Sequence, residues 1–318
     1  MIQLSSSPHI ASKITTRHVM WAVVISMLPE AVYGVILFGI PALLTICASV
    51  ATAIVSEFLF NKITGKKQTV TDGSAAITGL LLALVLPPTL PLWQTILGAA
   101  FAIIVAKQLF GGLGSNVWNP ALTGRAFLFA SFPAAMGANW ISPLPDAVSS
   151  ATILSTLKQA DAVTSATTVG AAAPIDYLAL FFGRQAGCIG ESSIMLILIS
   201  AVFLIATKIV DWRTPVFMVG TFALLMWISG GDVLAHVLSG GLVFGAVFMA
   251  TDYVTSPVTA PGRIVFGAGC GLLTFLIRKF GGYPEGVMFS ILIMNSIVPF
   301  LNKLTPRMYG YKKQGGSK

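Results

Sequence analysis

Residues 19–40 read VMWAVVISMLPEAVYGVILFGI, an apolar run in which Glu30 is the one charged side chain. A transmembrane helix needs roughly 20 apolar residues, so this run is long enough to cross a bilayer. The whole chain has a similar character, with 55% hydrophobic residues, 9% charged residues and a mean hydropathy of +0.86. A chain of 318 residues with this composition cannot bury its apolar surface in one soluble core. The sequence therefore predicts an all-α polytopic membrane protein.

Further apolar runs follow the first, separated by short breaks rich in Gly, Pro or charged residues. The pattern predicts about ten transmembrane helices, at 19–40, 42–60, 74–87, 92–109, 120–135, 190–207, 214–229, 233–251, 263–277 and 285–302. Several of these runs are shorter than the roughly 20 residues of a full span, so their ends and any internal breaks stay open.

Lys and Arg are distributed unevenly between the two sides that this pattern defines. If the N-terminus lies inside, four of the 19 basic residues fall outside, namely Lys158, Arg184, Arg278 and Lys279, and the other 15 fall inside. Cytoplasmic loops carry such an excess, so both termini are predicted to be cytoplasmic. Membrane orientation accounts for the net charge of +8 without a nucleic-acid partner, and the lipid bilayer is the expected surrounding.

The chain divides into three parts. Residues 1–135 form a first membrane half of about five spans, 136–189 an outer-face connection, and 190–318 a second half of about five spans. An odd number of spans per half makes the halves run in opposite directions, which predicts a 5+5 inverted repeat with broken helices. The tripeptide Phe-Gly-Gly follows the fourth span at 110–112 and the ninth at 280–282, which agrees with a repeat.

A Gly-rich segment after the fourth span, GGLGSNVWNPA at 111–121, is predicted to be a functional loop. Its glycines allow close backbone approach, while Asn116 and Asn119 offer amide hydrogen bonds and Trp118 a stacking face, which together suit a flavin ring. The three cysteines are isolated and have no metal-binding spacing, so no metal site is predicted.

The chain has 11 acidic residues, and several of them lie within or beside the predicted spans. Glu30 lies within the first span, where a carboxylate is costly unless it is paired or hydrated, so cation passage and structural pairing are both open. Asp72 is interpreted as the N-cap acid of the third span, and Asp252 ends the eighth; both could join a polar site on the inner side. Glu57 is expected to reach the inner membrane interface.

The connection between the halves contains Asp161-Ala162-Val163-Thr164-Ser165-Ala166-Thr167. Runs of small and hydroxyl residues are common in loops, and that reading alone would assign no function. The same run also has what a flavin-attachment site needs: a reachable hydroxyl on Thr167, small neighbours and an acid.

Several motifs occur in a defined order along the chain. They are TDGSA at 71–75 with TGLL at 78–81, Asn116 with NPALT at 119–123, Asp161 to Thr167, Gly187 with GES at 190–192, Thr251-Asp252 with TSP at 255–257, and GYPEG at 282–286. Together they resemble the family of D subunits of the Rnf-type ion-translocating ferredoxin:NAD oxidoreductase, relatives of the B subunit of the sodium-pumping NADH:quinone oxidoreductase. The resemblance covers about residues 10–310.

This resemblance implies two flavins. FMN would be joined through a phosphoester to Thr167 by a flavin transferase, with Asp161, Thr164, Ser165 and Ala166 completing the motif and Thr168 as the alternative acceptor. Ser165 stands where the family pattern has Gly. A second, non-covalent flavin, riboflavin, would lie in the membrane part near Asn116, Asn119 and Thr123.

The implied function is electron transfer between an outer-face flavoprotein subunit and a cytoplasmic NAD-reducing side, coupled to Na⁺ or H⁺ movement across the inner membrane of a prokaryote. The partners would be the A, B, C, E and G subunits of the complex. The protein would position flavins without catalytic acid–base residues of its own. A passive channel or solute transporter with the same inverted repeat is the alternative, and a structural scaffold is a third reading.

Overall fold

The computed structural model describes residues 15–137, 140, 143, 152, 154–158, 176–183 and 185–304. Over these residues the chain forms helices and no strand. Each of the ten predicted ranges contains helix, so the prediction of an all-α chain is confirmed for this part of the molecule.

The described residues from 15 to 137 form eight helical elements. They are α1 (Thr16–Phe38), α2 (Ile40–Ile63), the 3-10 turn η1 (Val70–Asp72), α3 (Ser74–Leu84), α4 (Leu92–Ile103), the π-helical η2 (Ile104–Gln108), α5 (Pro120–Ser131) and α6 (Pro133–Gly137). The connection ends with α8 (Tyr177–Phe182) and the start of the 3-10 turn η3 (Ile189–Glu191). In the described part of the second half follow α9 (Ile194–Ala206), α10 (Arg213–Ile228), α11 (Val233–Leu238), α12 (Leu242–Phe244), the π-helical η4 (Gly245–Met249), α13 (Ala260–Phe280) and α14 (Val287–Leu304).

Three of the described helices, α1, α2 and α13, are long and apolar enough to cross a membrane. Five shorter apolar helical segments accompany them, formed by α3, α4 with η2, α9, α10 and α14. Large apolar side chains on α1 are exposed at helical spacing, among them Ile25, Val32 and Ile36. A surface this apolar suits contact with lipid. These features agree with a multi-pass membrane protein.

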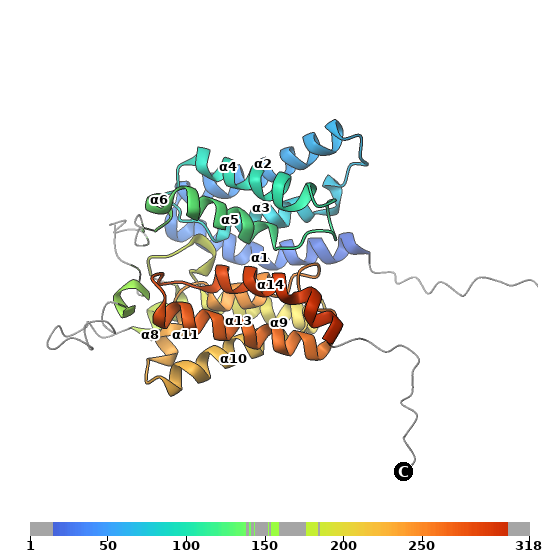
Figure 1. The fold of residues 1–318 in the computed structure, drawn as a ribbon. Coiled ribbons are helices and arrows are strands. Elements are labelled where there is room, and N and C mark those ends of the chain that lie inside the picture. The colour runs from blue at the N-terminus through green and yellow to red at the C-terminus, as the bar shows by residue number, and fades with distance from the viewer. Residues whose placement is uncertain are drawn as a thin grey trace, which may run out of the picture.

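The two halves occupy opposite sides of one bundle, with the first half in the upper part of Figure 1 and the second in the lower part. In the first half α2 packs on α3 and α4, and in the second α10 packs on α13 and on η4. Contacts of α1 with α9 and of α5 with α14 join the halves. The start of α1 and the end of α14 lie at one end of the bundle, while α6, α8 and α11 lie at the other (Figure 1).

Two predicted spans are interrupted. The range 120–135 divides into α5 and α6 at Phe132, because Pro133 has no backbone N–H to continue the helix. The range 233–251 breaks between α11 and α12, where Gly240 takes a left-handed φ of 69°. Both breaks free backbone groups, which a membrane protein can satisfy only inside protein or in a hydrated cavity.

Candidate functional site

A first cavity lies at the end of the bundle where α1 begins. Its polar wall comes from the starts of α3 and α5, from η2, and from the segment that follows η4. We call it the Lys107 pocket; it is lined in part by Ser74, Thr78, Lys107, Asn116, Asn119 and Asp252, with apolar Leu81, Val247 and Phe248. Its volume is about 80 Å³. A ligand with fused rings therefore requires movement of lining side chains such as the half-exposed Leu113 and Tyr253.

A buried ion pair forms part of this wall. The Lys107 ammonium donates to Glu57 Oε2 at 2.7 Å and to Ser74 Oγ at 2.6 Å, and the Lys107 and Glu57 side chains are 2% and 1% exposed. The second Glu57 oxygen accepts from Thr69 Oγ1 at 2.5 Å, and Asn61 donates to that threonine. The expectation that Glu57 reaches the membrane interface is wrong, because its side chain is buried and pairs with Lys107 of η2, which packs directly on α2.

The two asparagines predicted to bind a flavin both line the Lys107 pocket. Asn119 also caps α5, since its side-chain oxygen accepts from the Ala121 and Leu122 amides at 3.0 and 3.3 Å. Asn116 donates to the Trp118 carbonyl at 3.1 Å. The amide groups are thus partly committed to loop structure, and the Asn116 and Asn119 side chains still lie at the cavity wall.

Other sequence-predicted residues of this region take different positions. Thr123 donates to the Asn119 carbonyl at 2.9 Å and is not among the pocket-lining residues. The Trp118 indole donates to Ser296 on α14 at 2.8 Å and also does not line the pocket. Asn116 and Asn119 therefore line the cavity, whereas Thr123 and Trp118 do not.

The acidic residues singled out in the sequence also lie in different places. Asp252 lines the Lys107 pocket and accepts from Thr255 Oγ1 at 3.0 Å. Asp72 accepts from the Ser74 amide at 2.7 Å, but the N-cap of α3 is Gly73, so the capping prediction was wrong by one residue. Glu30 is 2% exposed on α1, and neither carboxyl oxygen has a hydrogen-bond partner among the described residues. A buried carboxylate without such a bond is costly unless a cation or water compensates its charge.

A second cavity lies at the opposite end of the bundle, where α6 ends. We call it the Arg125 pocket; it is lined in part by Arg125, Gln185, Glu191, Ser239, Tyr283 and Glu285, and its volume is about 290 Å³. Arg125 on α5 donates to Glu285 Oε2 at 2.6 Å, which bridges the two halves. Glu191 accepts from the Cys188 amide at 2.8 Å. Sequence reasoning did not single out Arg125, because an arginine near a span end is ordinary and its partner lies 160 residues away.

The break before α12 shapes the Arg125 pocket. A Cβ at Gly241 would lie 2.8 Å from Glu285 Oε1, and one at Gly240 would lie 3.2 Å from Arg278 Nη2. Arg278 is buried on α13 and donates to the carbonyls of His236 and Ser239 at 2.6 and 3.4 Å. Ser239 Oγ itself is buried without a hydrogen-bond partner among the described residues. The glycines thus let charged side chains approach the backbone at the cavity wall.

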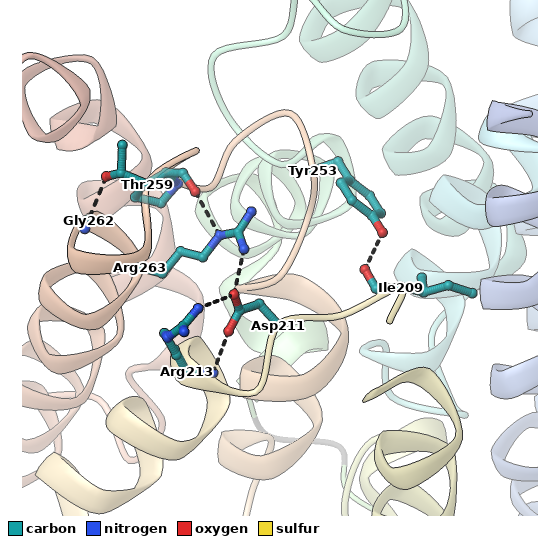
Figure 2. A network of polar contacts seen from close by, with 8 residues as sticks. Ile209, Asp211, Arg213, Tyr253, Thr259, Gly262 and Arg263 are labelled. Carbon is teal, nitrogen blue, oxygen red and sulfur yellow. Dashed lines mark hydrogen bonds and ion pairs between the residues drawn. The ribbon is translucent and has the colours of Figure 1, made fainter. Parts of the chain in front are cut away.

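A third cavity, of about 400 Å³, adjoins the Lys107 pocket, and both are lined by Ile209, Val210, Thr251 and Tyr253. Figure 2 shows Arg213 and Arg263 converging on Asp211, with distances to Oδ2 of 2.9 and 2.6 Å, and the Tyr253 hydroxyl donating to the Ile209 carbonyl. Partial burial alone would raise the pKa of Asp211. The Arg213 amide and the Arg263 guanidinium outweigh burial, so this pKa lies below its ordinary value.

The predicted attachment segment from Asp161 to Thr167, including Thr164, Ser165 and Ala166, lies outside the described residues. The same holds for the alternative acceptor Thr168. The described residues on either side of this segment are 154–158 and α8. They lie at the end of the bundle where the Arg125 pocket is found, and Leu154 lines that pocket.

Comparison with known proteins yields a family and close relatives. A family model described as "NQR2, RnfD, RnfE family" matches residues 3–310. The chain is 44% identical to the D subunit of the proton-translocating ferredoxin:NAD⁺ oxidoreductase complex of Clostridium ljungdahlii, over 98% of this chain and 96% of that protein. It is 42% identical to the D subunit of the Na⁺-translocating ferredoxin:NAD⁺ oxidoreductase complex of Acetobacterium woodii, over 98% and 96%. It is 37% identical to the D subunit of the ion-translocating oxidoreductase complex of Stutzerimonas stutzeri, over 93% of each chain.

Proposed function

The chain belongs to the NQR2, RnfD, RnfE family, and we propose that it is the D subunit of an ion-translocating ferredoxin:NAD oxidoreductase complex. The observation that carries this proposal is 42–44% identity, over nearly the full length of both chains, to two subunits that bear that description. The partners are then the remaining subunits of the complex, A, B, C, E and G, and a flavin transferase that matures the protein.

The proposed topology has ten spans in a 5+5 inverted repeat, with both termini on the cytoplasmic side of the inner membrane. The packing supports it, since α2 contacts α3 and α4 as α10 contacts η4 and α13. A basic side chain also reaches a serine in each half: Lys107 donates to Ser74 Oγ at the start of α3, and Arg278 donates to the Ser239 carbonyl just before α12. The Lys107 pocket then faces the cytoplasm and the Arg125 pocket the outer side, so Arg125, counted with the inner basic residues in the sequence, moves to the outer group and the split becomes 14 inside to 5 outside.

Two flavins are proposed, FMN joined to Thr167 and non-covalent riboflavin. The Arg125 pocket is the proposed site for the FMN ring, because it has a volume of about 290 Å³, a buried guanidinium and the Ser239 hydroxyl, which makes no hydrogen bond to the residues that the structure describes. The Lys107 pocket is the proposed seat for riboflavin, held by Asn116 and Asn119 between apolar walls. Flavins bound there would supply electron transfer between the two faces. The protein's own residues would orient the rings, keep water from them and compensate their charge.

The proposed ion route uses Glu30 and Asp252, with Asp72 near its inner mouth. Glu30 is the strongest member because both of its carboxyl oxygens are buried and make no hydrogen bond within the described part of the chain. The translocated ion is proposed to be Na⁺ or H⁺, because the subunits of a proton-translocating and of a Na⁺-translocating complex are similarly related to this chain, at 44% and 42% sequence identity.

Intact-protein mass spectrometry after co-expression with a flavin transferase tests the redox assignment. The wild-type chain should carry an FMN-sized mass increment that Thr167→Ala abolishes and the adjacent Thr168→Ala retains. Loss in Thr168→Ala alone would move the acceptor by one residue. A wild-type chain without the increment would contradict the flavin assignment. A reporter fused after Ala160 should show outer-face activity, and cytoplasmic activity would contradict the orientation.

A further inference from the structure

Lys107 is a buried cation at a cavity wall, and this position indicates a role beyond packing. It lies in the π-helical turn η2, and such turns often occur at functional sites because they displace a side chain from the regular helical register. An ammonium group has three donors, and two of them reach Glu57 and Ser74. The side chain also lines the Lys107 pocket, where its third donor can reach a ligand.

The counter-ion of Lys107 stands behind the wall and not inside the cavity. Glu57 does not line the pocket, and Thr69 holds its other oxygen from the far side. The ammonium is therefore placed between a fixed carboxylate and the cavity. Charges are weakly screened in a low-dielectric interior. A negative charge that appears in the cavity therefore interacts strongly with this ammonium.

Asp252 is the other charged residue among those that line the pocket. Lys107, Glu57 and Asp252 together carry one negative charge when all three are ionised, so an anionic ligand is favoured only when Lys107 turns from Glu57 toward it. Asn116 and Asn119 are neutral and cannot compensate a full charge. Lys107 is thus the cation among the residues that line this cavity in the described part of the chain.

We propose that Lys107 is the charge-compensating residue of the Lys107 pocket, and that Glu57 limits its strength by competing for the same ammonium. This inference rests on the proposed function, in which the pocket takes a flavin. A flavin held there by Asn116 and Asn119 would supply two-electron chemistry, with the flavin on Thr167 as the electron donor, and after uptake of one proton its reduced form would carry one negative charge. Lys107 stabilises that form relative to the oxidised, neutral form.

The competition predicts opposite effects for the two members of the ion pair. Lys107→Gln removes the compensating charge, so the reduced form should bind at least about tenfold more weakly relative to the oxidised form. For a two-electron couple that ratio lowers the midpoint potential by about 30 mV. Glu57→Gln frees the ammonium from its competitor and should shift the ratio in favour of the reduced form. A purely structural role would move both variants in the same direction.

The test is a spectroscopic redox titration of the full-length chain carrying Thr167→Ala, so that only the non-covalent flavin titrates. Lys107→Arg keeps the charge and should stay near the parent, and Lys62→Gln on the exposed end of α2 is the matched distant control. Equal shifts of the same sign for Lys107→Gln and Glu57→Gln, or no shift in either, would overturn the inference. If Lys107→Gln loses the flavin, the sign of the Glu57→Gln shift decides.

Failure of the underlying function gives a different result. A parent chain that carries no non-covalent flavin after mild extraction would contradict the assignment of the pocket, and the inference would fall with it. A parent that holds flavin with a potential indifferent to both substitutions would leave the assignment intact and overturn the role of Lys107 alone.

Discussion

The Lys107 and Arg125 pockets place a buried cation at opposite ends of one bundle, and they differ in where the counter-ion stands. Glu57 lies behind the wall of the Lys107 pocket, whereas Glu285 lines the Arg125 pocket beside its arginine. The volumes differ as well, at about 80 and 290 Å³. We call Lys107–Glu57 the closed pair, because its carboxylate does not line a cavity, and Arg125–Glu285 the open pair, because both of its members do. The closed pair can respond to charge in a small cavity, whereas the open pair can bind a larger polar ligand directly.

The closed pair should show the largest loss of stability. Lys107→Met leaves Glu57 charged and buried without its partner, which costs about 3–5 kcal/mol by comparison with other buried pairs. The double variant Lys107→Met/Glu57→Leu should recover most of that loss, because no unpaired charge remains. Thermal unfolding in detergent measures both. A double variant as unstable as the single one would show that the cost comes from packing and not from charge.

The Arg125 pocket depends on backbone conformation where the Lys107 pocket depends on the ion pair. Gly240→Ala should destabilise the protein by about 1–2 kcal/mol, because an alanine at its φ of 69° is strained, and its Cβ would also press on Arg278 at 3.2 Å. Gly65→Ala is the matched control, with φ 66° and no atom within 4 Å of the added Cβ. A greater loss for Gly240→Ala isolates the contact with Arg278. Equal losses would reduce the break to a question of backbone strain.

The sequence predicted the helical fold class, and it singled out two asparagines that line the Lys107 pocket, for identifiable reasons. Hydropathy periodicity gives helices directly, and Asn116 with Asn119 stood out as amides in a Gly-rich break. The ion pairs were beyond its reach. Lys107 and Glu57 are 50 residues apart and Arg125 and Glu285 are 160 apart, so each residue alone looked like an ordinary charge near a span end. Single-sequence patterns carry local periodicity, whereas a buried pair exists only after the helices have packed.

Asn119 provides a smaller test of the Lys107 pocket, since it both caps α5 and lines the cavity. Asn119→Ala should cost about 1 kcal/mol through the lost cap, and it should weaken ligand binding in the Lys107 pocket. Asn119→Asp keeps a capping oxygen and should recover the stability while removing the amide donor. Thermal unfolding and flavin retention measured on the same samples separate the two roles. Unchanged flavin retention in both variants would assign Asn119 to capping alone.

The third cavity gives the smallest expected effect and a reference that should leave both pockets unchanged. Asp211 is partly exposed, so Asp211→Asn should cost at most about 1 kcal/mol at neutral pH. Its pKa is lowered in the folded protein, so its stabilising contribution is complete above the ordinary carboxyl pKa of about 4 and fades as the pH falls through the folded value. The difference in melting temperature between wild type and Asp211→Asn should therefore shrink on acidification. A difference that grows at low pH would mean that the carboxylate is not stabilised by Arg213 and Arg263. A shift in flavin potential in this variant would show that the wall formed by Ile209 and Tyr253 couples the third cavity to the Lys107 pocket.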